Sequence, residues 1–96
     1  MRFIWDPKKA ASNVRKHRVR FDEAVTVFAD PLAVVVSDSI HEDRSLILGQ
    51  SAVGRLLVVV FAEPEEEPDG EGELRVISAR RATKHERRRY EEDEED

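Results

Sequence analysis

Apolar residues recur with two different spacings along the chain, and these spacings divide it into strands and helices. Runs rich in aliphatic and aromatic residues, which suit a pleated sheet, predict five strands. They cover Arg2–Trp5, Leu32–Ser37, Arg44–Gln50, Arg55–Ala62 and a segment that begins at Leu74 and ends at Arg80 or Arg81. Because Leu56–Phe61 is apolar at every position, we expect the fourth strand to be central and buried on both faces.

Three helices are predicted between and after these strands. The segment from Asp6 to about Lys16 starts with an Asp-Pro pair, which suits the N-cap and first turn of a helix. Apolar residues at helical spacing predict a second helix over Asp22–Phe28, with its aromatic side chains in the core. A capping box is formed by Thr83 and Glu86, whose side chains can each accept a backbone amide hydrogen, so a third helix begins there.

The predicted order of elements is β-α-α-β-β-β-β-α, an α+β fold. Strands joined by turns form a small antiparallel meander, and the helices are expected to bury their apolar sides on one face of it. Gly49 is a candidate for a β-bulge. The chain suits one domain over residues 1–91, with a mobile acidic hairpin loop at 63–72 and a disordered acidic tail at 92–96.

Charge is distributed unevenly along the chain. The formal net charge is −5, yet Glu63–Glu73 holds seven acids and no base, and Glu91–Asp96 holds six acids. The rest of the chain carries all 16 Lys and Arg residues against 8 Asp and Glu, a formal charge of +8. A basic body favours binding to phosphate backbones. The acidic runs either stay solvated and keep that body soluble or neutralise its cations.

The composition argues against several classes of protein and site. Without cysteine there is no disulfide, cysteine-based zinc site or thiol nucleophile. No apolar run reaches the ~18 residues of a membrane span and no signal peptide is apparent, so we expect a cytoplasmic protein. His41-Glu42-Asp43 offers three metal ligands in one turn, but no second cluster supports them. Glycine-rich phosphate loops are missing as well, so we expect no metal or organic cofactor.

A dense group of cations lies where the last strand becomes the last helix. From Arg75 to Arg89 there are seven Lys or Arg residues and one His. Metal-free RNA cleavage needs a base for the 2′-hydroxyl, a cation for the phosphorane and an acid for the leaving oxygen. Arginine serves the second role best, through its planar fork of donors. The candidate catalytic residues are Arg80, Arg81, Lys84, His85, Glu86 and Tyr90.

Several of these candidates have a structural alternative. In the structural alternative, Glu86 only caps the helix and Tyr90 only packs on the sheet. Asn13 and His17 share a helical face, where they could join the helix to the next segment by hydrogen bonds or take part in catalysis. The predicted RNA-binding residues are Lys16, His17, Arg55, Arg87 and Arg88.

Arg80 and Arg81 are neighbours on a strand, so their side chains should point to opposite faces. They cannot then both serve one phosphate. We favour Arg80 as the catalytic cation because it lies an even number of residues from Val76 and Ser78, so that the three side chains should share one face of the strand. Arg81 is then expected to pair with an acid or to fix the strand to its neighbour.

Two motifs in this sequence resemble signatures of the BrnT family, toxins of type II toxin–antitoxin pairs. The first is Trp5-Asp6-Pro7-x-Lys9-Ala10-x-x-Asn13-x-x-Lys16-His17-x-Val19-x-Phe21-x-Glu23-Ala24. The second is Ile77-Ser78-Ala79-Arg80-Arg81-Ala82-Thr83-x-x-Glu86-Arg87-x-x-Tyr90-Glu91. With the strand Leu56–Val60 between them, the similarity covers most of residues 3–91. The acidic loop 63–72, where a shorter hairpin would be usual, and the acidic tail depart from the pattern.

The resemblance implies a RelE-like fold and a ribonuclease activity that blocks translation. It also implies a co-encoded antitoxin with a ribbon-helix-helix DNA-binding half. The pair would then repress its own operon, and the toxin would be held at operator DNA only through its partner. Two other functions stay open at this point. One is a non-catalytic nucleic-acid-binding module, and the other is an interaction protein that acts only as a corepressor of the antitoxin.

Overall fold

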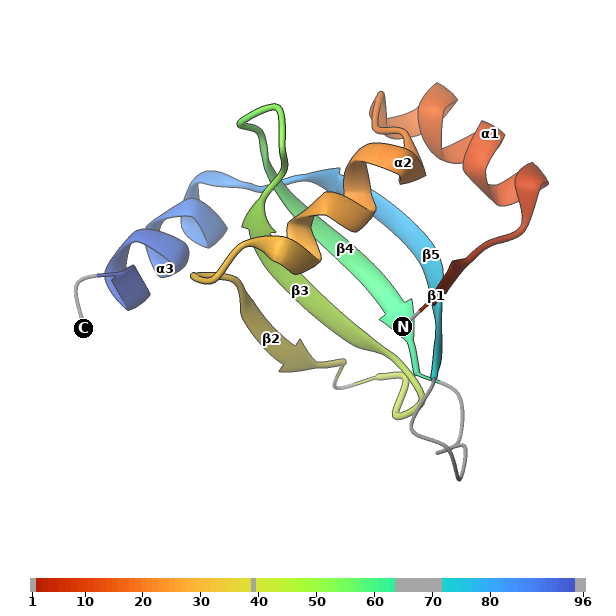
Figure 1. Ribbon diagram of the computed structural model, residues 1–96. Helices are drawn as coiled ribbons and strands as arrows, with labels where there is room; N and C mark the ends of the chain where they lie inside the picture. Colours follow the sequence, from red (N-terminus) through yellow and green to blue (C-terminus); the bar gives the residue numbers. More distant parts are fainter. Residues whose placement is uncertain (1, 39, 64–71, 95–96) are drawn as a thin grey trace.

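The computed structural model describes residues 2–38, 40–63 and 72–94, which form one open sheet flanked by helices (Figure 1). The strands are β1 (Arg2–Ile4), β2 (Val34–Ser37), β3 (Ser45–Gln50), β4 (Leu56–Ala62) and β5 (Glu73–Arg81). The helices are α1 (Pro7–His17), α2 (Phe21–Ala24), the 3-10 helix η1 (Val25–Ala29) and α3 (Lys84–Glu94). Along the chain the order is β1, α1, α2, η1, β2, β3, β4, β5, α3.

The sheet is mixed, with the strand order β1-β5-β4-β3-β2. Strands β2 to β5 form the predicted antiparallel meander. Strand β1 instead lies parallel to β5, with Arg2 opposite Glu73 and Ile4 opposite Arg75, so the expectation of a purely antiparallel sheet is wrong. The chain leaves β1 through the first helices and enters the sheet at its opposite edge. The meander therefore returns to β1 with β5 running in the same direction.

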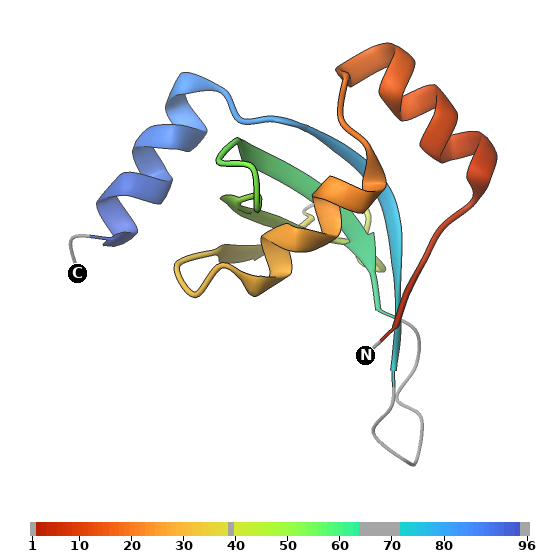
Figure 2. The same ribbon diagram turned by 45° about the horizontal axis from the view of Figure 1, so that its top comes forward.

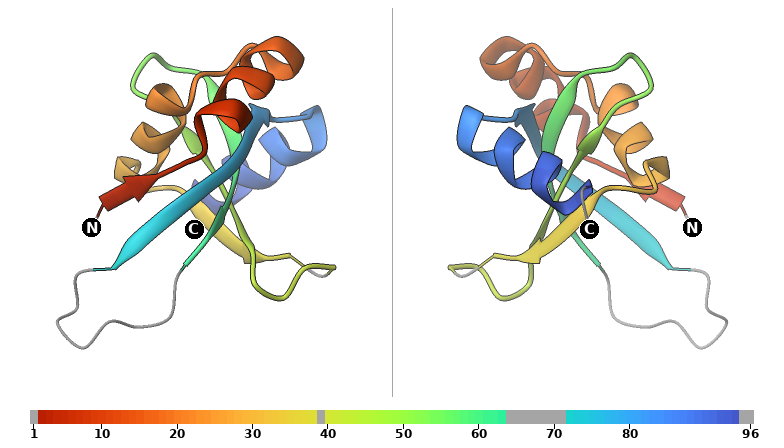
Figure 3. Two further views of the ribbon diagram at one scale, coloured as in Figure 1. Left: turned by 90° about the vertical axis from the view of Figure 1, so that its right-hand side faces the viewer. Right: turned by 90° about the vertical axis from the view of Figure 1, so that its left-hand side faces the viewer.

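Helices cover both faces of this sheet. On one face Phe21 and Val27, from α2 and η1, pack with Leu57, Val59 and other buried residues in the larger core cluster. On the other face Tyr90 of α3 packs with Leu48, Leu56 and Val58, and the edge-on views show α3 opposite α1 and α2 (Figure 3). The prediction that β4 is central and buried on both faces is confirmed. The expectation that all helices lie on one face is wrong. Since β4 is apolar on both sides, helices must shield both faces of the sheet from water.

The second predicted helix is split into the single α-helical turn of α2 and the 3-10 helix η1. The residues of η1 include two β-branched valines and Thr26, which favour other conformations over a regular helix. The Thr26 hydroxyl donates to the carbonyl of Glu23 at 2.6 Å, a bond that competes with the α-helical pattern. The predicted aromatic core is confirmed, since Phe21 is buried and the ring of Phe28 contacts those of Phe3 and Phe61.

The sheet contains a β-bulge, but not at Gly49. Gly49 pairs regularly with Leu57, and a Cβ there would lie 2.9 Å from a methyl carbon of Val27. Glycine at this position therefore lets η1 approach β3 closely. The bulge lies between β4 and β5, where Val60 pairs with Ser78 and Phe61 pairs with Val76, so that Ile77 is the extra residue.

The last helix is longer than predicted. It runs to Glu94, so residues 92–94, which we expected in a disordered tail, are helical. Most of the predicted acidic loop, residues 64–71, and the last two residues lie outside the described residues. In the orientation of Figure 2, α1 lies beside β5 and α3 lies on the opposite side of the molecule from α1.

Candidate functional site

Cations gather at the end of the sheet where β5 stops. Arg80 and Arg81 are the last two residues of β5, opposite Val58 and Leu57 of β4. Arg55 immediately precedes β4, and α3 begins three residues after Arg81. The structure therefore brings together, at one end of the sheet, both arginines predicted for catalysis and one predicted for RNA binding.

Arg80 and Arg81 lie on opposite faces of the sheet, as predicted, because their cross-strand partners belong to the two different apolar clusters. The extra residue Ile77 shifts the alternation by one position. Val76 and Ala79 consequently belong to the same face as Arg81. We favoured Arg80 because its side chain was expected on the same face as that of Val76. This argument is wrong, because the bulge lies between the two residues and places them on opposite faces.

The residue paired with an acid is Arg80 and not Arg81. Its two terminal nitrogens donate to the two carboxylate oxygens of Glu86, at 2.8 and 2.9 Å. The pair is only partly buried, with 39 % of the Arg80 side chain and 26 % of the Glu86 side chain exposed. One terminal nitrogen also donates to the carbonyl of Arg81 at 3.3 Å. This bidentate geometry fixes the Arg80 side chain between the end of β5 and the first turn of α3.

The predicted capping box is confirmed at the start of α3. The Thr83 amide donates to a carboxylate oxygen of Glu86 at 2.8 Å, and the Glu86 amide donates to the Thr83 hydroxyl at 3.2 Å. The hydrogen bonds from Arg80 are the main reason that the pKa of Glu86 falls from 4.5 to about 2, against an opposing effect of burial. A carboxylate with so low a pKa is a weak proton acceptor, so the geometry supports a structural role for Glu86.

Tyr90 is a packing residue whose hydroxyl joins α3 to the end of η1. Its side chain is 6 % exposed among the apolar residues beneath α3, which confirms the packing alternative. Its hydroxyl donates to a carboxylate oxygen of Asp30 at 2.7 Å, and the same oxygen accepts the Gln50 amide at 2.8 Å. Burial raises the pKa of Asp30, but hydrogen bonds from Gln50, Tyr90 and Leu32 outweigh it and leave the pKa below its ordinary value.

A second ion pair lies on the face of the sheet that α2 covers. Arg55 donates to both carboxylate oxygens of Glu23, from Nε at 2.8 Å and from Nη2, and Nη2 also donates to the carbonyl of Arg18 at 3.2 Å. The buried Ser51 hydroxyl donates to Glu23 at 2.8 Å. The bonds from Arg55 are the main cause of the lowered pKa of Glu23, and the charge of Arg81 contributes. Arg55 thus has a structural role in addition to any contact with nucleic acid.

The remaining cations of this region are exposed. Their side chains make no hydrogen bond or ion pair with any other described residue, which leaves them able to bind an anion. They are Arg81 at the end of β5 and Lys84, His85, Arg87, Arg88 and Arg89 in α3. Of the two strand-end arginines, only Arg81 therefore presents a guanidinium that is not already bonded to a carboxylate.

Asn13 fastens α1 to the outer edge of β5. Its side-chain nitrogen donates to the carbonyls of Val19 and Ala79, at 2.9 and 2.8 Å, and its oxygen accepts the Ala79 amide at 3.0 Å. The side chain is buried, so the structural alternative for Asn13 is confirmed. His17 is exposed instead, and with Lys16 it lines a groove between α1 and β5.

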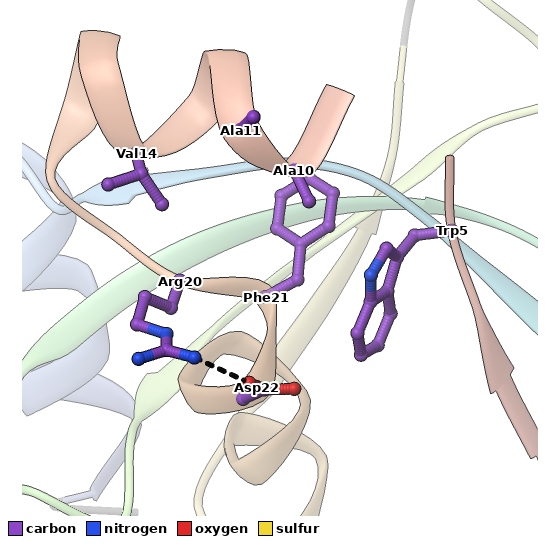
Figure 4. A pocket seen from close by; sticks show the side chains of 7 residues that line it. All are labelled: Trp5, Ala10, Ala11, Val14, Arg20, Phe21 and Asp22. Atoms are coloured by element: carbon purple, nitrogen blue, oxygen red, sulfur yellow. Dashed lines mark hydrogen bonds and ion pairs between the residues drawn. The ribbon is translucent and has the colours of Figure 1, made fainter. Parts of the chain in front are cut away.

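A different pocket, of about 200 Å³, lies between α1 and the start of α2 (Figure 4). Trp5 and Phe21 form its wall, with ring centroids 5.8 Å apart in an edge-to-face contact. An exposed ion pair between Arg20 and Asp22, 3.2 Å long, lies at its rim. Its lining is mainly apolar, so it does not match a phosphate-binding site.

Within residues 2–38, 40–63 and 72–94, no three His, Asp or Glu side chains are grouped so that they could hold a metal ion. The candidate turn residues His41, Glu42 and Asp43 are all exposed. No helix in the described part of the chain combines the length and the apolar character that crossing a membrane requires.

Sequence reasoning did not identify the partners of Arg55 or most of the α1–β5 groove. Glu23 and Arg55 are 32 residues apart, and no local pattern connects them. For the groove a signal existed, because Lys9, Ser12 and Lys16 recur at spacings of three and four and must share a helical face. The bulge that completes the groove gives no comparable signal.

Two comparisons with known proteins point to the same family. The family model for the ribonuclease toxin BrnT of type II toxin–antitoxin systems matches residues 5–86. The crystal structure of the Brucella abortus ribonuclease toxin BrnT is similar to this fold, with a TM-score of 0.67 and 28 % sequence identity. That alignment covers 88 % of this chain and 99 % of the Brucella chain. No curated protein matched. This chain belongs to the BrnT family of ribonuclease toxins of type II toxin–antitoxin systems.

Proposed function

We propose that this protein is a metal-independent endoribonuclease that acts as a toxin. The observation that carries the proposal is the match of the ribonuclease toxin family model to residues 5–86. That range includes both arginines at the end of β5 and the first turn of α3. The exposed cations found there supply the positive charge that cleavage of a phosphodiester requires.

Arg81 is the cation best placed to stabilise the phosphorane. It lies at the end of a strand, which is a rigid support, and its guanidinium is exposed without a carboxylate bonded to it. Lys84 and His85 follow in the first turn of α3 and are exposed as well. In this scheme His85 transfers protons, since an imidazole can both accept and donate one. Arg80 and Glu86 hold the start of α3 in position.

The biological setting forms part of the same proposal. Cleavage of RNA would block translation in the cytoplasm, and a co-encoded antitoxin of ribbon-helix-helix type would neutralise the toxin and repress the operon. A RelE-like fold would fit this function. The relative from Brucella abortus is named a ribonuclease toxin, which supports the activity. The need for an antitoxin partner follows from membership of a type II toxin–antitoxin family.

Metal independence can be tested with purified protein and a labelled RNA in excess EDTA. Cleavage should continue, and the products should end in a 2′,3′-cyclic phosphate and a 5′-hydroxyl, because the 2′-hydroxyl is the nucleophile. Loss of cleavage in EDTA that a divalent metal restores would contradict the proposal. A 5′-phosphate product would also contradict it, because it indicates attack by water. Salt-sensitive RNA binding without any product would identify a binding module instead.

A further inference from the structure

A polar groove of about 170 Å³ lies between α1 and the outer edge of β5, beside the β-bulge. Lys9, Ser12, Lys16 and His17 line it from the helix, and Ile77 and Ser78 line it from the strand. Ile77 is the extra residue of the bulge. Bulges are frequent at sheet edges and next to functional sites, where they redirect the strand.

The groove exists because two different partners cover the edge of β5. Strand β1 pairs with β5 only as far as Arg75, which lies opposite Ile4. Farther along, the Asn13 side chain holds both the amide and the carbonyl of Ala79. The bulge lies between these two fixed points. The edge of β5 is therefore held open at the bulge, and the lysine-bearing face of α1 borders the opening.

The chemistry of the lining fits a phosphate group. Lys9, Lys16 and His17 are exposed cations or potential cations, and Ser12 and Ser78 provide half-buried hydroxyl donors. None of the described residues that line the groove is acidic. Lysines and hydroxyl groups are typical contacts of the sugar–phosphate backbone, which position a nucleic acid without reading its sequence.

The groove also lies near the exposed cation at the end of β5, Arg81. Ser78 precedes Arg81 by three residues on the same strand, a distance of about 10 Å at the usual rise of a strand. At the other border, His17 is followed by Arg18, whose carbonyl is bonded to Arg55. The side chains of Ser78 and Arg81 point to opposite faces of the sheet, so a single RNA strand would contact both the groove and Arg81 by passing around the outer edge of β5. An acidic peptide is less suited, because Ile77 is the one apolar side chain among the described residues that line the groove, and it offers little to the residues between the acids.

We propose that this groove binds the RNA backbone beside the cleaved bond, with Lys9 and Lys16 as phosphate contacts. The inference rests on the proposed ribonuclease function and adds the surface that holds the substrate. Its test is a binding measurement, so that the groove and the cleavage reaction can fail separately.

The test compares two double variants that lose the same charge from the same helix. Lys9→Gln with Lys16→Gln alters the groove, and Lys8→Gln with Arg15→Gln alters exposed residues of α1 that do not line it. The probe is a mixed-sequence single-stranded RNA, 2′-O-methylated so that it cannot be cleaved. Binding is measured by fluorescence anisotropy at several salt concentrations. The groove variant should lose about 1.4 from the salt slope, at about 0.7 per phosphate contact. The control variant should keep the slope of the original protein.

A third variant tests the groove without a change of charge. Ser78→Ala removes one hydroxyl donor and should raise the Kd several-fold while the salt slope and the melting temperature stay constant. Equal Kd values and salt slopes for the two double variants would overturn the inference, even if the protein cleaves RNA. If the groove variant loses binding to a polyglutamate peptide while its RNA binding is unchanged, the groove belongs to a protein partner and the inference is overturned as well. A protein that never cleaves RNA, but whose groove variant shows the predicted change in slope, would support the groove and reject the nuclease.

Discussion

At the scale of single residues, the sheet separates two neighbouring arginines and gives them different surroundings. Arg80 faces α3 and is bonded to Glu86, whereas Arg81 lies on the other face near Glu23, which is already bonded to Arg55. An ion pair as exposed as that of Arg80 adds only about 1 kcal/mol to stability. Its main effect is to orient the chain where β5 becomes α3.

Replacement of Arg81 by alanine should therefore reduce RNA cleavage and leave the fold intact. The loss of a cation that stabilises the transition state typically lowers the rate by about 10²–10³-fold. Initial cleavage rates and thermal unfolding of purified protein measure the two effects. Arg80→Ala is the comparison variant: its melting temperature should fall, and its cleavage should fall less than that of Arg81→Ala, because Arg80 positions the start of α3 without contacting the phosphate. The opposite result would return the catalytic role to Arg80.

The ion pair of Glu86 should also make stability depend on pH in acid. The pKa of Glu86 in the folded protein is about 2, below its ordinary 4.5. Its contribution is therefore fully present above about pH 4.5 and is lost as the pH falls toward 2. Urea unfolding of the original protein and Glu86→Gln should show a stability difference that shrinks across this range. A difference that stays constant from pH 7 to pH 2 would show that the charge of Glu86 does not stabilise the fold.

At the scale of elements, α3 is attached to the sheet through both of its ends. Its first turn is fixed by the capping box and by Arg80, and its second half is anchored by Tyr90. Asp30, at the end of η1, accepts hydrogen bonds from Tyr90 and from the last residue of β3. One carboxylate thus connects three elements, η1, β3 and α3.

Tyr90→Phe separates this anchoring role from catalysis. Loss of the hydroxyl removes one donor from a half-buried carboxylate, which should lower the free energy of unfolding by about 1–1.5 kcal/mol. The ring still packs on the sheet, so cleavage should stay within about twofold of the original. Chemical denaturation and a cleavage assay provide the two measurements. Abolished cleavage with unchanged stability would make the Tyr90 hydroxyl a participant in proton transfer.

Local signals predicted the elements better than their arrangement. The Asp6 cap, the capping box at Thr83 and the doubly buried β4 each depend on residues close in sequence, and each is confirmed. The parallel pairing of β1 depends on a strand about 70 residues away, and no turn motif indicates it. The bulge at Ile77 adds one residue without a Gly or Pro to mark it. That single residue reversed the expected orientation of Arg80 relative to Val76.

At the scale of the whole molecule, the cations occupy more than one surface. The proposed RNA contacts run from the α1–β5 groove to Arg81, whereas Arg87 and Arg88 belong to α3, which covers the opposite face of the sheet from α2. The acids that make the chain formally negative are concentrated in residues 63–73 and 91–96. Net charge alone therefore conceals a basic body, and only the positions of the charges along the chain indicate a polyanion as ligand.

The pairing of β1 with β5 also determines when this protein can fold during its own synthesis. Asn13 and Ala79 are 66 residues apart, so β1 and α1 leave the ribosome long before the strand that they require. At about 5–20 residues per second, the completed helix α1 waits roughly 3–12 s for Ala79 to be added. A chain released before β5 would have neither the closed sheet edge nor Arg81. Abortive translation products should therefore be harmless to the cell, and toxicity should begin only after the ribosome has passed β5.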